Sequence, residues 1–118
     1  MTLLNDTDIE EVGGITPEQK KKIDDFLQGA AYCWCNLKKD EWFALRNLVG
    51  GENHFWQGTP LIVLYDKHNG IADDPVKNAG IDAGWLFKAM LHADKRKFET
   101  KREHVRMYKW IKDESVED

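Results

Sequence analysis

The side chains best suited to chemistry in this sequence are its four histidines and two cysteines. Two of the histidines follow a carboxylate by two positions, in the pairs Glu52–His54 and Asp66–His68. A metal site would require two or more such segments to converge, because metal ions take several protein ligands at once. The sequence has no second pair of cysteines to complete such a set. We therefore expect structural or surface histidines, with no metal and no other cofactor.

The two cysteines, Cys33 and Cys35, are separated by a single residue. On a helix their side chains would point about 200° apart, so a disulfide between them is unfavourable. Cys33 lacks a flanking motif typical of catalytic nucleophiles, and the Gly-Gly pairs at 13–14 and 50–51 lack the lysine and spacing of a phosphate-binding loop. The sequence thus predicts reduced cysteines and no enzymatic activity, with a metal-dependent hydrolase as the enzymatic alternative.

Charge is distributed unevenly along the chain. The net charge is −4, yet residues 88–112 hold nine Lys/Arg and three Asp/Glu. The last six residues, 113–118, hold four acids and no base. A basic region on an acidic protein is typical of a surface that faces a polyanion. The alternative is a solvated basic hairpin that pairs with the acidic tail.

The length of 118 residues suits a single domain. No apolar run approaches the length of a membrane span, and the acidic N-terminus lacks the pattern of a secretory signal. We expect a cytoplasmic protein that does not enter a membrane. Its parts would be a flexible acidic leader at 1–14, one folded domain at 15–112 and an acidic tail at 113–118.

A long amphipathic helix is the first element that the sequence predicts. Thr16 can cap this helix, Pro17 suits its first turn, and Gln19 completes a capping box. The helix should end near Asn36, and one of its faces should lie against the core. The apolar residues that recur at helical spacing on that face are Ile23, Phe26, Leu27, Ala30, Ala31 and Trp34.

Three shorter segments follow. A helix is expected between Asp40 and the glycines at 50–51, and it would bury Trp42, Phe43, Leu45, Leu48 and Val49. Thr59-Pro60 repeats the cap-then-proline signal, although the run 61–65 by itself could also be a buried strand. Asp74-Pro75 opens a short helix that would stop at Gly80. After Asp94 the pattern becomes extended, and alternation predicts a β-hairpin over about 97–111 with its turn near 101–103.

The strongest local motif is Ala79-Gly80-Ile81-Asp82. A small residue, a glycine, an aliphatic residue and a helix-capping residue follow in order, which resembles the turn of helix-turn-helix DNA-binding modules. Gly80 can take the left-handed conformation that ends one helix, and Asp82 can cap the next. The residues that the next helix would present to a groove of DNA are Ala83, Trp85, Lys88 and His92.

The basic hairpin after this motif extends the resemblance, because a helix-turn-helix followed by a hairpin over about 74–111 resembles the winged-helix superfamily. The resemblance implies a mainly α, winged-helix-like fold, with an α+β helical domain of other topology as the alternative. It also implies a small protein that binds double-stranded DNA, such as a transcriptional regulator or a mobile-element accessory protein. The wing would contact phosphates through Lys95, Arg96, Lys97, Lys101, Arg102 and Arg106.

The helix after the motif also supports a second hypothesis. Trp85, Phe87 and Leu91 lie away from the line of Leu86 and Met90, and a helix that is apolar on all sides is usually buried. The alternative function is therefore non-enzymatic protein–protein interaction. A surface of Trp85, Phe87 and Leu91 would then bind a protein partner or form a homodimer.

Overall fold

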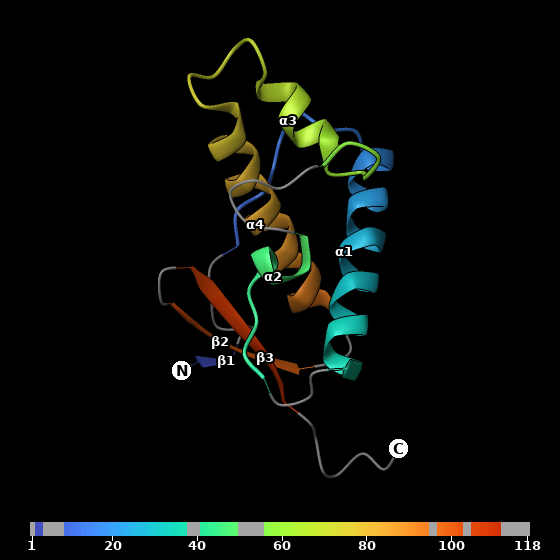
Figure 1. Ribbon diagram of the computed structural model, residues 1–118, viewed down its shortest axis with the longest axis vertical. Coiled ribbons are helices and arrows are strands. Elements are labelled where there is room, and N and C mark those ends of the chain that lie inside the picture. The colour runs from blue at the N-terminus through green and yellow to red at the C-terminus, as the bar shows by residue number, and fades with distance from the viewer. Residues whose placement is uncertain are drawn as a thin grey trace.

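The computed structural model of the protein describes residues 2–3, 9–37, 41–49, 56–94, 97–102 and 105–111. Figure 1 shows α1 and α4 side by side along the long axis, with α3 near one end and a small sheet at the other. The architecture is mainly α with a short C-terminal β-hairpin, as the sequence predicts. The elements in chain order are β1 (Thr2–Leu3), α1 (Pro17–Leu37), α2 (Leu45–Val49), α3 (Ile62–His68), α4 (Pro75–Ala93), β2 (Lys97–Arg102) and β3 (Arg106–Ile111).

The start of α1 confirms the predicted capping box. The Gln19 N–H donates to Thr16 Oγ1 at 3.1 Å, and the Thr16 N–H donates to Gln19 Oε1 at 2.9 Å. These bonds satisfy backbone groups that a helix start leaves without partners. Residues of α1 that recur every four positions are buried against the core: Ile23, Leu27, Ala31 and Cys35. Cys33 is exposed and Cys35 is buried, and both are free thiols, as predicted.

The predicted turn at Ala79–Asp82 is wrong, because α4 runs through it without a break. The helix begins as expected, since Asp74 Oδ1 accepts the Lys77 N–H at 3.0 Å and Pro75 occupies the first turn. It then continues for 19 residues to Ala93. Gly80 is not among the glycines with positive φ in the described residues. It therefore does not end a helix.

Burial explains why α4 continues past its glycines. A glycine inside a helix costs about 1 kcal/mol relative to alanine. This cost is smaller than the gain from burying one continuous apolar face, which contributes about 1.5–3 kcal/mol for each large side chain. That face consists of Ala79, Ala83, Leu86, Phe87, Met90 and Leu91. Asp82 caps nothing, and its Oδ2 instead contacts His68 Nε2 at 2.7 Å and Lys67 Nζ at 2.8 Å on α3.

The corner between helices lies earlier in the chain, at residues 69–74 between α3 and α4. Gly70 has a φ of 84°, the left-handed conformation that glycine adopts without steric cost. The run 61–65, which could have been a strand, belongs mainly to α3. The Lys67–Asp82 ion pair at 2.8 Å then joins α3 to α4.

The segment between α1 and α3 differs from the prediction. The helix α2 is only five residues long, and Trp42 and Phe43 precede it instead of forming part of it. Phe43 is extended and exchanges two backbone hydrogen bonds with Tyr108 of β3, at 2.8 and 2.7 Å. Asp40, the predicted cap, lies outside the described residues.

The sheet has three antiparallel strands in the order β1-β2-β3. The predicted hairpin is confirmed, with Thr100 opposite Tyr108 and Arg102 opposite Arg106. Its turn was predicted too early, because Lys101 and Arg102 still belong to β2. The leader was expected to be loosely attached, but its Thr2–Leu3 strand pairs with β2, and Val12 packs against the core. The predicted leader boundary is therefore corrected. The acidic tail 113–118 lies outside the described residues.

Aromatic rings join the two halves of the core. Phe43 is fully buried, and its ring centroid lies 6.1–6.2 Å from those of Trp34, Phe87, Phe98 and Tyr108. Such tilted and edge-to-face contacts add about 0.5–1.5 kcal/mol per pair beyond the burial of area. The core therefore lies where α1, α4 and the sheet meet, and Phe43 is at its centre.

Candidate functional site

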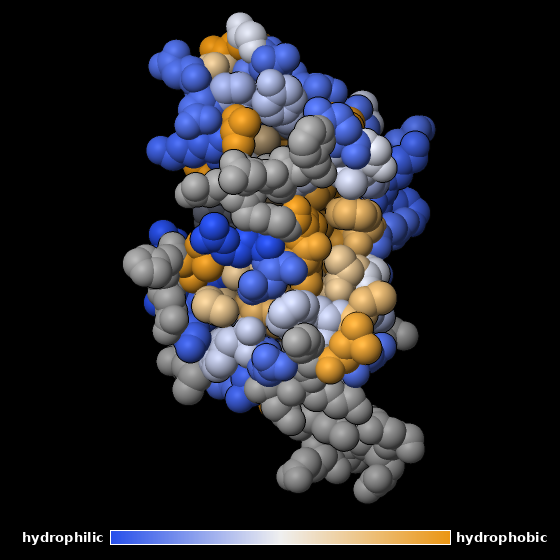
Figure 2. Space-filling view, viewed as in Figure 1, coloured by the Kyte–Doolittle hydropathy of each residue, from blue (hydrophilic) through white to orange (hydrophobic). Residues whose placement is uncertain are grey.

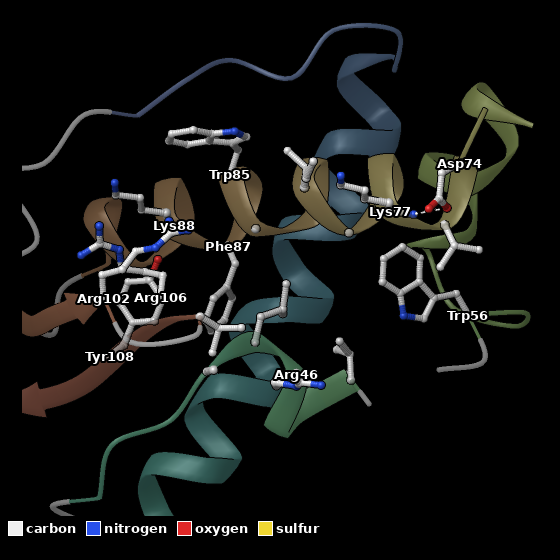
Figure 3. A pocket seen from close by; sticks show the side chains of 18 residues that line it. Arg46, Trp56, Asp74, Lys77, Trp85, Phe87, Lys88, Arg102, Arg106 and Tyr108 are labelled. Carbon is white, nitrogen blue, oxygen red and sulfur yellow. Dashed lines mark hydrogen bonds between the residues drawn. The ribbon is translucent and has the colours of Figure 1, made fainter. Parts of the chain in front are cut away.

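A groove of about 820 Å³ lies between α2, residues 76–88 of α4 and the tip of the hairpin. Figure 3 shows Lys88, Arg102 and Arg106 together at the hairpin end, Lys77 and Asp74 at the other end, and Arg46 on α2. The apolar side chains that line the groove include Leu45, Val49, Trp56, Val76, Ile81 and Trp85. Figure 2 shows apolar side chains at the centre of one face of the molecule, bordered by strongly hydrophilic ones.

Basic side chains dominate the charge of this groove. Among the described residues, Arg46, Lys77, Lys88, Arg102 and Arg106 line it, against Asp74 as the single acid. The Asp74 carboxylate already accepts the Lys77 N–H as the cap of α4. Across the described part of the chain, no carboxylate forms an ion pair with Arg46, Lys77, Arg102 or Arg106. The groove is therefore positively charged on a protein whose net charge is negative.

The hairpin divides its cations between two faces. Side chains directly opposite each other on paired strands point to the same face, and successive side chains alternate. Arg102 and Arg106 are opposite each other and lie on the same face as the buried Thr100 and Tyr108, which is the groove side. Arg106 Nη1 also donates to Thr100 Oγ1 at 3.4 Å.

The outer face of the hairpin carries the other predicted phosphate contacts that the structure describes, Lys97 and Lys101. Lys101 Nζ lies 4.4 Å from the centre of the Trp42 ring, and Lys109 Nζ lies 5.8 Å from it. A cation–π contact of this kind holds a lysine over an aromatic face without neutralising its charge. Lys95 and Arg96 lie outside the described residues. The six wing cations predicted from the sequence therefore do not form one surface.

The four residues of α4 that were predicted to face DNA do not share one surface either. Ala83 is fully buried in the core and is not available to a ligand, so that prediction is wrong. Trp85 and Lys88 line the groove, with Lys88 Nζ 5.3 Å from the centre of the Trp85 ring and the Lys88 side chain largely buried. His92 is exposed near the end of α4 and does not line the groove.

The proposed interaction surface of Trp85, Phe87 and Leu91 is also corrected. Phe87 and Leu91 are each 1% exposed, so they belong to the core and cannot meet a partner. Only Trp85 remains partly exposed. The physical reason is that Phe87 lies on the buried face of α4, where its ring centroid is 5.5 Å from that of Tyr108.

Tyr108 forms part of the groove wall at the hairpin end. Its side chain is 2% exposed. Burial raises the pKa of the phenol far above its ordinary value of 10.0, and the nearby Arg106 guanidinium lowers it by a smaller amount. The phenol therefore stays neutral under physiological conditions and adds no negative charge to the groove.

Lys67, His68 and Asp82 form a cluster of ionisable residues away from the groove. Lys67 Nζ also donates to the Gly13 carbonyl, so this lysine joins the leader to α3 and α4. No group of three or more His, Cys, Asp or Glu within the described ranges could hold a metal ion. The contacts observed in this cluster connect structural elements.

The groove includes residues that sequence reasoning missed. They are Lys77, Ile81 and Gly84, which lie three or four positions apart. Gly84 also lies four positions before the predicted Lys88, so a continuous helix brings them to one face with it. The assumed break at Gly80 hid this spacing. No sequence pattern indicates that Arg46 lies in the groove, because the position of α2 depends on the contact between Phe43 and Tyr108.

Comparisons with known proteins do not identify the chain: no family model, no curated protein and no solved structure matches it. None of the helices in the described segments has both the length and the hydropathy needed to cross a membrane.

Proposed function

We propose that this chain is a small, non-enzymatic protein that binds double-stranded DNA through the tip of its hairpin and the exposed start of α4. The observation that carries this proposal is a set of four cations that share the groove and have no carboxylate partner among the described residues: Arg46, Lys77, Arg102 and Arg106. DNA presents phosphates along both edges of its grooves, and basic side chains that replace condensed counterions bind it without regard to sequence.

The order of elements supports the same proposal. The pair α3–α4 is followed directly by the hairpin, which resembles the arrangement of a helix-turn-helix and wing. In helix-turn-helix proteins the first residues of the second helix contact base edges. On α4 those residues are not the ones predicted from the sequence, and we now assign limited base contacts to Lys77 and Ile81. Ile81 is 51% exposed, which suits apolar contact with a thymine methyl group.

A cytoplasmic location, as in a transcriptional regulator or an accessory protein of a mobile element, fits this proposal. Both cysteines are free, and free thiols persist where the compartment is reducing. The outer face of the hairpin, with Lys97 and Lys101, would lie away from a duplex seated at the groove. Charge reversals on the two faces of the hairpin therefore test which one meets DNA.

The test measures fluorescence anisotropy of a labelled random duplex against protein concentration at several salt concentrations. Three phosphate contacts, from Arg46, Arg102 and Arg106, predict a slope of log K against log salt of about −2.7. Arg102→Glu/Arg106→Glu should weaken binding at least about tenfold and reduce the magnitude of that slope by about 2. Lys21→Glu/Lys22→Glu on the exposed side of α1 changes the net charge equally and should change affinity by less than about threefold.

Three results would contradict the proposal. One is the absence of binding at low salt. Another is an equal loss of affinity in the α1 control, which would show that only net charge matters. A larger loss for Lys97→Glu/Lys101→Glu than for the groove pair would move the DNA contact to the outer face of the hairpin and would likewise reject the groove as the contact.

A further inference from the structure

The floor of the groove has a property that DNA binding does not explain. Gly80 and Gly84 are one helical turn apart on the side of α4 that lines the groove. Apart from the adjoining backbone of α4 itself, a Cβ added to either glycine would meet no atom of the described residues within 4 Å. Glycine lowers the stability of a helix interior relative to alanine, and packing among the described residues does not require it here. Two glycines at this spacing leave room for another chain to approach the backbone of α4 closely.

The surroundings of these glycines are apolar. Val76 and Ile81, which are 44% and 51% exposed, flank them on α4, and Val49 lies across the groove on α2. Exposed apolar side chains beside a groove are typical of an interaction site. The sugars and phosphates of DNA offer little to fill such a floor, whereas an apolar face of a peptide does.

We propose that this groove binds a short amphipathic helix with acidic borders, supplied by a protein partner. The charge of the rim selects an acidic occupant, because Arg46, Lys77 and the hairpin-tip arginines have no carboxylate partner among the described residues. The distance along α4 from Lys77 to Lys88 is about 16 Å, which matches about three turns of helix. An acidic helix would therefore place its apolar face on the glycines and its carboxylates beside the rim.

A helical occupant fits better than an extended one because of the walls of the groove. Its walls are α2, α4 and the hairpin, and on the edge strand β3 the backbone N–H and carbonyl of Tyr108 are already bonded to Phe43. An extended peptide would leave its backbone groups without partners there, whereas a helix satisfies them internally. This inference does not depend on DNA binding, although Arg102 and Arg106 cannot serve a peptide and a duplex at the same time.

The experiment uses the full chain and three 14-residue helical peptides without DNA. The first has a leucine stripe bordered by glutamates, the second has lysine for every glutamate, and the third has the first composition in scrambled order. Binding is measured by fluorescence anisotropy and mapped through the backbone amide signals of Gly80, Gly84 and Gly29. The acidic amphipathic peptide should bind at least about tenfold more tightly than the other two and should move the signals of Gly80 and Gly84 but not that of Gly29.

A matched pair of substitutions tests the floor. Gly84→Leu fills the groove and should weaken peptide binding at least about tenfold, while Gly29→Leu on the exposed side of α1 should leave it within about twofold. Both positions are helical with open space around them, so both variants should fold, and thermal unfolding checks this. Equal binding of the scrambled peptide, unchanged binding by Gly84→Leu, or no shift at Gly80 and Gly84 at millimolar peptide would overturn the proposal.

DNA provides the remaining comparison. If Gly84→Leu abolishes duplex binding and leaves peptide binding intact, the groove floor is a DNA surface and the peptide proposal is wrong. If duplex binding fails for the unmodified protein while the acidic peptide binds, the groove proposal stands and the DNA proposal fails.

Discussion

Phe43 and Tyr108 exchange two backbone hydrogen bonds, 2.8 Å from the Phe43 N–H to the Tyr108 carbonyl and 2.7 Å in return. Their ring centroids are 6.2 Å apart. This single bridge joins the segment before α2 to the middle of β3, 65 positions later in the sequence. Because α2 follows Phe43 at once, the bridge also sets where α2 meets α4 and thereby forms one wall of the groove.

Replacing Phe43 with alanine should lower the free energy of unfolding by about 3–5 kcal/mol, because the ring is fully buried and its removal leaves a cavity. Urea denaturation followed by far-UV circular dichroism measures this. Leu37→Ala is the control, since Leu37 is 82% exposed and its loss should change stability by less than about 0.5 kcal/mol. Similar losses in both variants would show that Phe43 is not central to the core.

Substituting alanine for Gly80 and Gly84 should stabilise the protein. Each change improves helix propensity by about 1 kcal/mol, and the added methyl groups meet no atom of the described chain within 4 Å. Differential scanning calorimetry should show a melting temperature raised by several degrees. Gly70→Ala should have the opposite effect, because Gly70 has a φ of 84° that alanine adopts only under strain. A destabilised Gly80→Ala variant would indicate a close neighbour or a real turn at that position.

Asp82→Asn should destabilise the corner between α3 and α4. The Asp82 carboxylate contacts Lys67 Nζ and His68 Nε2, and all three side chains are largely shielded from water. We expect a loss of about 1–2 kcal/mol, which corresponds to charged hydrogen bonds at a partly buried site. A double-mutant cycle with Lys67→Met should give a coupling energy above about 0.5 kcal/mol. Strictly additive effects would mean that the two side chains do not interact in solution.

The pH dependence of stability should reveal the buried phenol of Tyr108. Burial raises its pKa in the folded protein above the unfolded value of 10.0, so the folded state holds its proton while the unfolded state releases it. Stability from this group is therefore complete below pH 10 and falls above it, by up to about 1.4 kcal/mol per pH unit.

Urea denaturation between pH 8.5 and 11 measures this dependence. Tyr108→Phe should show a shallower loss of stability above pH 10 than the unmodified protein. Tyr65→Phe is the control, because the Tyr65 hydroxyl is at the surface, where it donates to Asn69 Oδ1 at 3.5 Å. Identical slopes for the unmodified protein and Tyr108→Phe would contradict a buried, neutral phenol.

Local chemistry in the sequence determined several elements by itself. The capping box of Thr16 and Gln19, the Asp74 cap before Pro75 and the two strands of the hairpin appear where they were predicted, although the hairpin turn lies later than expected. Each of these features depends on groups only a few residues apart, so a local sequence pattern is enough to predict it. The charge asymmetry was also visible from the sequence, since it needs only a count.

Tertiary structure decided the rest. Ala79–Asp82 has the composition of a turn, yet burial of one continuous face holds it in α4, and Asp82 pairs with residues of α3. The groove could not be predicted from the sequence, because it depends on a bridge between Phe43 and Tyr108 and on a strand register that places Arg102 opposite Arg106. Local propensities are worth about 1 kcal/mol or less per residue, so long-range packing overrides them wherever several large side chains are buried together.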